Sequence, residues 1–268
     1  MKVEVIIDTI EADGFEMDYC SFGQGKRAMV IIPGLSLTPV TPNARAVARQ
    51  YKSFADDYRV YLFDRKRNAE MGYTIEQMAA DTAKAMKALG IKDACVMGCS
   101  QGGMIAQVMA ATEPELVGKL ALCSTTACVV EYSKGVFSRW EKLAREGEPV
   151  PFNHDVFTHV YSKKYYEQRA RAFAMAERVA SEKDLNQFIP LVHSLLAFDA
   201  RHLLKDIKCP VKVIGSAIDE VLTGDCSIAL AKSLGCDLYM YSDYGHAAYD
   251  EAPDYQDHLH SFFDAAAE

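Results

Sequence analysis

A serine between two glycines lies where the chain could carry out nucleophilic chemistry. It belongs to the segment Gly98–Gly102, which reads GCSQG, with an apolar run at 94–97 before it and a helical pattern at 100–111 after it. A serine on such a strand-to-helix turn adopts strained backbone angles, so its neighbours must lack bulk. The turn raises the Ser100 hydroxyl above a sheet, and the N-terminus of the helix favours negative charge that develops there. The pattern predicts that Ser100 is a nucleophile.

Regularly spaced apolar residues predict the elements that position this serine. Apolar runs at 28–32 and 59–63 are typical of buried parallel strands, and a further strand is predicted at 119–123. One clear helix, at 75–89, begins with a capping-box pattern and ends before a glycine. The other predicted elements are a hairpin of strands at 3–10 and 17–22, strands at 94–97, 211–214 and 237–241, and helices at 100–111, 223–234 and 252–263. Strands that alternate with helices indicate an α/β fold.

The segment from Ser124 to Lys205 differs from the rest of the chain. It has almost no strand signals, and its aromatic residues recur at helical spacing among charged ones. The economical interpretation is a βαβ sheet interrupted by an all-helical insert, which is a candidate lid over a site. We therefore predict a core domain formed by residues 1–123 and 206–268, with residues 124–205 inserted as a helical lid.

The GCSQG segment and its flanking elements resemble the nucleophile elbow of the α/β-hydrolase superfamily, in its lidded, esterase-like branch of serine hydrolases. The resemblance covers essentially the whole chain. It implies an eight-stranded, mostly parallel sheet flanked by helices, with a helical lid inserted after the sixth strand. It also implies a catalytic triad in the chain order nucleophile, acid, base.

Two later segments match the acid and the base of that order. The segment Val211–Glu220 resembles the strand and loop that deliver the family's acid. This match favours Asp219, with Glu220 as the alternative because the spacing is one residue longer than usual. The segment Tyr244–Pro253 resembles the family's G-H-x-x-x-x-E-x-P, which makes His246 the expected base. His246 would accept the serine proton, and Asp219 would hold its tautomer and stabilise the imidazolium.

Attack of a serine on a carbonyl forms an oxyanion, which preorganised hydrogen-bond donors must stabilise. The resemblance implies that the residue after the nucleophile, Gln101, supplies one backbone N–H. It places the other donor on the loop after the third strand, where Pro33-Gly34-Leu35 stands for the family's His-Gly-x. We therefore expect the backbone N–H groups of Leu35 and Gln101 to form the oxyanion hole, although Pro33 replaces the histidine.

Three further residues are candidates for substrate binding. Lys66 and Arg67 follow the predicted strand at 59–63, where relatives have a glycine-rich loop. Such cations could attract a carboxylate or phosphate on the substrate, although a solvated loop is the alternative interpretation. Trp140 belongs to the aromatic residues of the predicted lid, which either pack between helices or line a pocket.

Composition excludes several classes of protein. The 268 residues include 29 Lys and Arg against 37 Asp and Glu, a formal net charge of −8, which gives no general attraction to nucleic acid or anionic membranes. The acidic N-terminus has no apolar run typical of a signal peptide, so we expect a cytoplasmic protein whose eight cysteines are reduced. The spacing of His and Cys predicts no metal site, and the expected triad needs no cofactor. We expect a monomer or homodimer that binds a small-molecule substrate.

Together these features predict a serine hydrolase that cleaves a carboxylic ester of a small to medium, partly apolar substrate through an acyl-enzyme intermediate. The same triad could hydrolyse a carbon–carbon bond, support a related lyase reaction, or cleave an amide as an aminopeptidase does. The sequence does not separate these reactions. A small-molecule receptor or sensor on a hydrolase scaffold is an alternative from another class.

Overall fold

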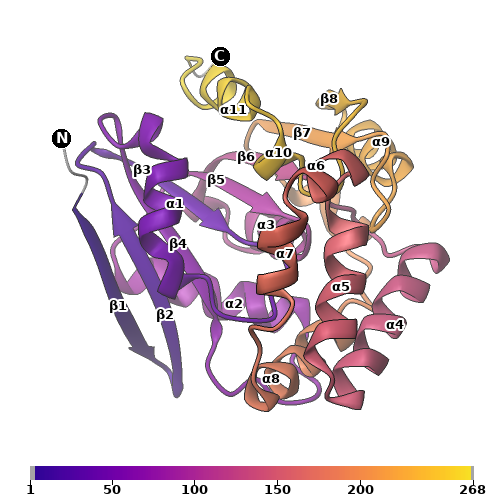
Figure 1. The fold of residues 1–268 in the computed structure, drawn as a ribbon. Helices are drawn as coiled ribbons and strands as arrows, with labels where there is room; N and C mark the ends of the chain where they lie inside the picture. The colour runs from indigo at the N-terminus through magenta and orange to yellow at the C-terminus, as the bar shows by residue number, and fades with distance from the viewer. Residues whose placement is uncertain (1–3, 267–268) are drawn as a thin grey trace.

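One eight-stranded sheet forms the centre of the protein, as the computed structural model of residues 4–266 shows (Figure 1). Its strands follow the order β1-β2-β4-β3-β5-β6-β7-β8. β2 pairs antiparallel with both β1 and β4, whereas the other neighbours pair in parallel. The strands are β1 (Val5–Ala12), β2 (Phe15–Phe22), β3 (Arg27–Ile32), β4 (Tyr58–Lys66), β5 (Ala94–Cys99), β6 (Val117–Cys123), β7 (Val211–Ser216) and β8 (Asp237–Tyr241). The predicted eight-stranded, mostly parallel sheet of an α/β protein is confirmed.

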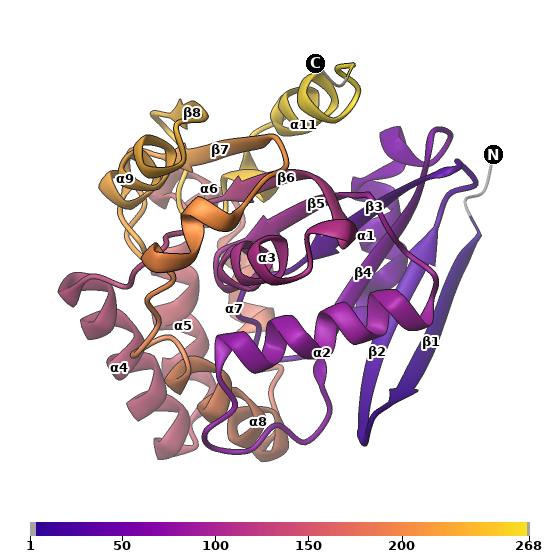
Figure 2. The ribbon, with the colours of Figure 1, turned by 180° about the vertical axis from the view of Figure 1, so that it is seen from behind.

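Helices cover both faces of the sheet (Figure 1, Figure 2). One face carries α2 (Ile75–Ala88), α3 (Gln101–Thr112) and α9 (Gly224–Leu234), and the other carries α1 (Ala44–Gln50) and α11 (Tyr255–Phe263). Each layer buries its own apolar cluster against the strands, with α2 and α3 in one cluster and α1 and α11 in the other. Because both faces are covered, the parallel strands read as continuous apolar runs.

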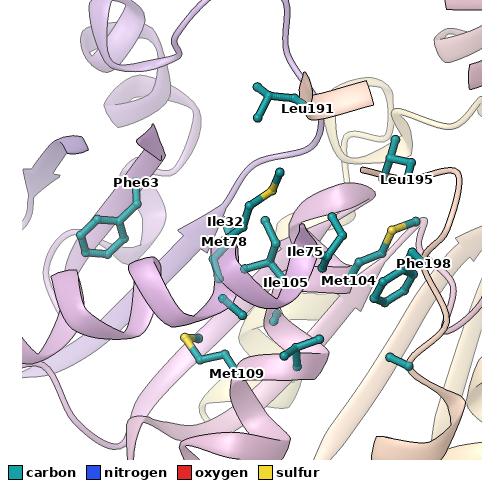
Figure 3. Packing of buried hydrophobic residues seen from close by; sticks show 14 of the residues in the cluster. Ile32, Phe63, Ile75, Met78, Met104, Ile105, Met109, Leu191, Leu195 and Phe198 are labelled. Carbon is teal, nitrogen blue, oxygen red and sulfur yellow. The ribbon is translucent and has the colours of Figure 1, made fainter. Parts of the chain in front are cut away.

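The cluster under α2 and α3 extends beyond the sheet. Figure 3 shows Ile75 of α2 and Met104 of α3 close to Ile32 of β3. Leu195 and Phe198, which follow the helix α8 (Glu182–His193), belong to the same buried cluster. The helical segment before β7 is therefore packed continuously onto the core of the sheet.

Two local features that the sequence predicts, a hairpin turn and a helix cap, are present in the structure. Asp13 and Gly14 join β1 to β2 with φ values of 44° and 83°, the left-handed backbone that a tight hairpin requires. At the start of α2, the Thr74 N–H donates to Gln77 Oε1 at 3.0 Å, and the Gln77 N–H donates to Thr74 Oγ1 at 3.3 Å. These reciprocal bonds form the predicted capping box.

The chain between β6 and β7 is helical, as predicted. Its helices are α4 (Glu131–Glu146), α5 (Pro149–Val160), α6 (Lys163–Gln168), α7 (Ala170–Ala176) and α8 (Glu182–His193). The two ends of this helical insert meet, because the Ala200 N–H donates to the Ala127 carbonyl at 2.8 Å and Cys128 forms a β-bridge with Asp199. Ends that lie side by side allow β6 and β7 to pair in parallel as neighbours. The division into a core and a lid domain stays a prediction.

Shorter elements complete the fold. They are the 3-10 helices η1 (Thr41–Asn43), η2 (Lys52–Phe54), η3 (Pro114–Leu116) and η4 (Arg201–Asp206), and the short helix α10 (Ala248–Glu251). Among residues 4–266, no helix is both long and apolar enough to cross a lipid bilayer. The uncharged stretch at 94–112 forms β5 and α3 instead.

Candidate active site

Ser100 lies at the turn between β5 and α3, at the carboxyl end of a central strand. Its backbone has a φ of 51° and a ψ of −121°, angles that a residue with a side chain rarely adopts. Contacts on both sides hold this conformation, since the Ser100 N–H donates to the Cys123 carbonyl at 2.9 Å and the Ser100 carbonyl accepts from Thr125 Oγ1 at 2.7 Å. The structure therefore contains the strained strand-to-helix turn that the GCSQG pattern predicts.

Two glycines allow the backbone to approach this turn closely. A Cβ atom at Gly102 would lie 2.0 Å from the carbonyl oxygen of Ile32, so a side chain there would force α3 away from the end of β3. A Cβ atom at Gly34 would lie 3.2 Å from the Cβ of Ser100. The loop after β3 is thus packed directly against Ser100, and the next residue of that loop is Leu35.

His246 is buried and pairs with the predicted acid. Its Nδ1 lies 2.7 Å from Asp219 Oδ2, while Asp219 Oδ1 accepts hydrogen bonds from the N–H groups of Val221 (2.7 Å) and Leu222 (2.9 Å). Burial alone would raise the pKa of Asp219, but His246 and the two amides outweigh it and hold this pKa below its usual value. The side chain of Glu220, the alternative acid, is exposed. The structure brings Asp219, and not Glu220, to His246.

The loop that carries His246 is anchored to the end of α5. The Glu251 carboxylate accepts from the Gly245 N–H at 3.1 Å and from the Ser162 N–H at 2.8 Å. The Ala247 N–H donates to the Val160 carbonyl at 2.9 Å. The position of the histidine therefore depends on contacts with the helical insert as well as on the sheet.

Ser100, His246 and Leu35 line one cavity of about 510 Å³. Gln101 follows Ser100 as the first residue of α3, so its backbone N–H lies at the N-terminus of a helix. The described residues show no hydrogen bond between Ser100 Oγ and His246, a contact that often tightens only when substrate binds. The cavity thus combines a hydroxyl, an imidazole paired with a carboxylate, and backbone N–H groups at a helix N-terminus. These are the parts that acyl transfer requires.

Arg65 connects both halves of the predicted oxyanion hole, a role that the sequence pattern does not single out. Its Nη2 donates to the Pro33 carbonyl at 2.7 Å, and its Nε donates to Gln101 Oε1 at 3.2 Å. Gln101 Nε2 in turn donates to the Leu191 carbonyl of α8 at 2.9 Å. Burial lowers the pKa of Arg65 to about 10. The only signal in the sequence is its place at the end of a buried strand, directly after Asp64.

The neighbouring cations Lys66 and Arg67 are engaged by other side chains. Arg67 lies 2.6 Å from Glu16 and 2.6 Å from Asp18, in ion pairs with two carboxylates. Lys66 Nζ lies 4.0 Å from the centre of the Tyr73 ring. Neither cation is among the described residues that line the Ser100 cavity. They line instead an adjoining pocket, which shares Pro33, Gly34 and Val40 with the Ser100 cavity.

Trp140 does line the cavity, together with other apolar residues of the helical insert. Its Nε1 donates to Asp155 Oδ2 at 3.1 Å, so the indole has a fixed orientation. Phe152 and Phe188 pack edge to face with ring centres 4.8 Å apart in the same wall. The insert thus supplies an apolar surface opposite the polar groups at the end of the sheet.

The wall also contains polar side chains that the sequence pattern does not single out, among them Asp250 of α10. Only its place inside the segment Tyr244–Pro253 could have drawn attention to it. Within residues 4–266, no three His, Cys, Asp or Glu side chains are grouped in a way that could hold a metal ion.

Comparison with known proteins relates this site to a family. Residues 27–253 match the sequence model of the alpha/beta hydrolase fold. The chain is 25% identical over 224 residues to 3-oxoadipate enol-lactonase 2 of Acinetobacter baylyi, a match that covers 81% of this chain and 80% of that protein.

Two solved structures share the fold over almost their whole length. An alpha/beta hydrolase enzyme from a deep-sea metagenome library has a TM-score of 0.87 at 20% identity, covering 97% of this chain and 98% of that one. The enol-lactonase from Burkholderia xenovorans has a TM-score of 0.84 at 22% identity, covering 96% of this chain and 100% of that one.

Proposed function

We propose that this chain, which belongs to the alpha/beta hydrolase fold family, hydrolyses a carboxylic ester with Ser100 as the nucleophile. One observation carries the proposal. The pair formed by His246 Nδ1 and Asp219 Oδ2, 2.7 Å apart, lies behind a cavity whose wall includes both His246 and the strained Ser100. A base that is itself oriented by a carboxylate, in one cavity with a hydroxyl at a helix N-terminus, is the arrangement that activates a serine.

The reaction begins when His246 Nε2 accepts the proton of Ser100 Oγ as the oxygen attacks the ester carbonyl. The carbonyl oxygen becomes an oxyanion, and the backbone N–H groups of Leu35 and Gln101 are proposed to donate hydrogen bonds to it. Asp219 stabilises the imidazolium without taking its proton. The imidazolium then protonates the departing alcohol, which leaves an acyl group on Ser100.

Water releases the acyl group in a second round of the same steps, with water as the nucleophile and Ser100 as the leaving group. His246 removes a proton from water, the hydroxide attacks the acyl carbonyl, and the returning proton restores the Ser100 hydroxyl. The carboxylic acid leaves, and the products balance one ester plus one water. The proposed triad therefore accounts for the complete reaction with groups of this chain.

The cavity supports a small to medium, partly apolar substrate. Its volume of about 510 Å³ lies within the range typical of small-molecule sites. Trp140, Phe152 and Phe188 of the helical insert offer apolar surface, and we propose that this insert acts as a lid. Two relatives are named as enol-lactonases, and a lactone is a cyclic ester. These names support ester chemistry over cleavage of a carbon–carbon bond.

Labelling with a fluorophosphonate, which phosphonylates an activated serine, tests the nucleophile. We expect the wild type to be labelled and to turn over short- and medium-chain p-nitrophenyl esters repeatedly. Ser100→Ala should abolish labelling and lower kcat by about 10⁵–10⁶-fold. Ser242→Ala, which changes an exposed serine, is the matched control and should behave as the wild type. A folded wild type that neither reacts nor turns over esters would contradict the proposal and favour a receptor that binds its ligand without cleaving it.

A further inference from the structure

Asp250 is part of the wall of the Ser100 cavity, four residues after His246. It lies in α10 and meets side chains from two distant helices. Gln50 Nε2, at the end of α1, donates to Asp250 Oδ1 at 3.0 Å. The Tyr161 hydroxyl, directly after α5, donates to Asp250 Oδ2 at 3.2 Å. Three segments far apart in the sequence thus converge on one carboxylate.

The charge of this carboxylate is not compensated within the described part of the chain. Among residues 4–266, no Lys, Arg or His nitrogen forms an ion pair with Asp250. Both of its hydrogen-bond donors are neutral, and a carboxylate can accept about four hydrogen bonds. The protein atoms around the cavity and the nearby Glu251 carboxylate raise the pKa of Asp250. Its side chain nevertheless remains open to the cavity.

A purely structural role does not require this charge. An asparagine would keep the helices α1, α5 and α10 together, because its amide could bond Gln50 and the Tyr161 hydroxyl without an uncompensated charge. Asp250 is exposed to the cavity, so its carboxylate presents a negative charge without a cationic partner to whatever the cavity binds. A cationic group on the ligand of this cavity would pair with that charge.

Aromatic rings next to this carboxylate narrow the chemistry of the ligand. Tyr51, Tyr161 and Tyr249 line the same cavity as Asp250. Ring faces attract cations, and the attraction is greatest where water is excluded. A carboxylate among tyrosine rings combines the two features by which proteins recognise an ammonium group.

We propose that Asp250, with the rings of Tyr161 and Tyr249, binds a positively charged ammonium group on the ester substrate. The inference rests on the proposed function, since it identifies the substrate class of the same cavity. Ser100 attacks the ester carbonyl while Asp250 holds the cation, so the distance between these two groups sets the length of the substrate. The enzyme would accordingly prefer a cationic ester to a neutral ester of the same shape.

Two matched pairs of esters test this preference. In the first pair the charge lies on the acyl group: the p-nitrophenyl esters of 4-(trimethylammonio)butyrate and of its neutral isostere, 5,5-dimethylhexanoate. In the second pair it lies on the alcohol: the butyrate esters of choline and of 3,3-dimethylbutanol. We expect the wild type to show a kcat/KM at least about tenfold higher for the charged member of at least one pair, the effect of a trimethylammonio group held by the Asp250 charge and the tyrosine ring faces.

Substitution of Asp250 then links the preference to the carboxylate. Asp250→Asn should bring the ratio of kcat/KM for the charged and neutral esters close to one, while Asp250→Glu should restore part of it. Labelling of Ser100 by the fluorophosphonate shows that each variant is folded and has an intact nucleophile. A wild type without preference in either pair, or an Asp250→Asn variant that keeps it, would overturn the inference. Failure of the proposed function gives a different result, because neither the neutral nor the charged esters would be cleaved.

Discussion

Asp219 and Asp250 both lie near Ser100, but Asp219 is buried whereas Asp250 is exposed to the cavity. Asp219 receives His246 on one oxygen and two backbone N–H groups on the other, and these lower its pKa. Asp250 receives one amide and one hydroxyl, faces the neighbouring Glu251, and has a raised pKa. The first carboxylate is fully used by the protein itself, whereas the second retains capacity for a ligand. Identical side chains thus divide the cavity into a reacting end and a proposed binding end.

Replacing Asp219 gives the largest expected effect that separates the two ends. Asp219→Asn should lower kcat about 10⁴-fold, because an amide no longer holds the imidazole tautomer that accepts the serine proton. The loss should be the same for charged and neutral esters, since this residue acts on the reacting atoms. Steady-state kinetics with both members of an ester pair measure it. Glu220→Gln is the matched control, and an equal loss in that exposed residue would transfer the acid's role to Glu220.

A second comparison, between Arg65 and Arg67, tests how the reacting end is held. Arg65 bridges the Pro33 carbonyl and the Gln101 side chain, whereas Arg67 pairs with exposed carboxylates. Arg65→Lys removes the fork that reaches both partners. Deleting one oxyanion donor costs about 10²–10³-fold in kcat, so displacing the donors slightly should cost about tenfold.

In Arg65→Lys, the KM and the preference for charged esters should equal those of the wild type, because the proposed cation site lies elsewhere in the cavity. Arg67→Lys is the matched control, with an expected kcat close to that of the wild type. A change of KM rather than kcat in Arg65→Lys would assign this residue to substrate binding instead.

The sequence predicts the reacting end better than the binding end, and the reason is physical. The turn at Ser100 follows from a local pattern, since a strand, two glycines and a helix are adjacent in the chain. The loops of Asp219 and His246 likewise follow directly after β7 and β8, two strands rich in apolar residues. Parallel strands place such loops at one edge of the sheet, so the candidate site could be assembled from local signals.

The binding end depends on contacts that no local signal encodes. Asp250 meets Gln50 and Tyr161, which are 200 and 89 residues away in the chain. Gln50 ends α1, a seven-residue helix with too few turns for a clear apolar period, and the sequence does not predict it. The predicted helix at 252–263 begins only at Tyr255, because residues 248–251 form the separate helix α10. The proximity of these three segments could only be seen in the structure.

The preference for charged esters should depend on pH, by a few-fold, over a range set by Asp250. The protein atoms around the cavity and the Glu251 carboxylate raise its pKa, whereas Gln50 and the Tyr161 hydroxyl oppose the shift. Tyr51 and Tyr249, which line the same cavity, are uncharged near neutral pH. As the pH falls, Asp250 should therefore be protonated before an ordinary carboxyl group. The ratio of kcat/KM for charged and neutral esters should fall with it. Using the ratio removes the titration of groups common to both reactions, and a ratio independent of pH in the wild type would contradict the assignment.

Thermal unfolding should give the smallest effect, with opposite signs for the two carboxylates. Asp219 has a lowered pKa in the folded protein, so its charge stabilises the fold above the pKa of the unfolded chain, and this contribution is lost as the pH falls. Asp250 has a raised pKa, so its charge destabilises the fold at neutral pH, and protonation relieves the cost. At pH 7, Asp219→Asn should lower Tm by several degrees. Asp250→Asn should raise it only slightly, because water that reaches the exposed side chain screens most of this cost.

The increase in Tm caused by Asp250→Asn should become smaller as the pH is lowered, because the wild-type carboxylate then becomes neutral as well. A cationic ligand should reduce this difference in Tm, because trimethylammonio compounds would stabilise the charged wild type and not the asparagine variant. Calorimetry at two pH values, with and without choline, measures both effects in the absence of turnover. A lower Tm in Asp250→Asn would show that the charge is needed to hold α1, α5 and α10 together. The Asp250 carboxylate would then have a structural role, and the cavity would have no separate binding end for a cation.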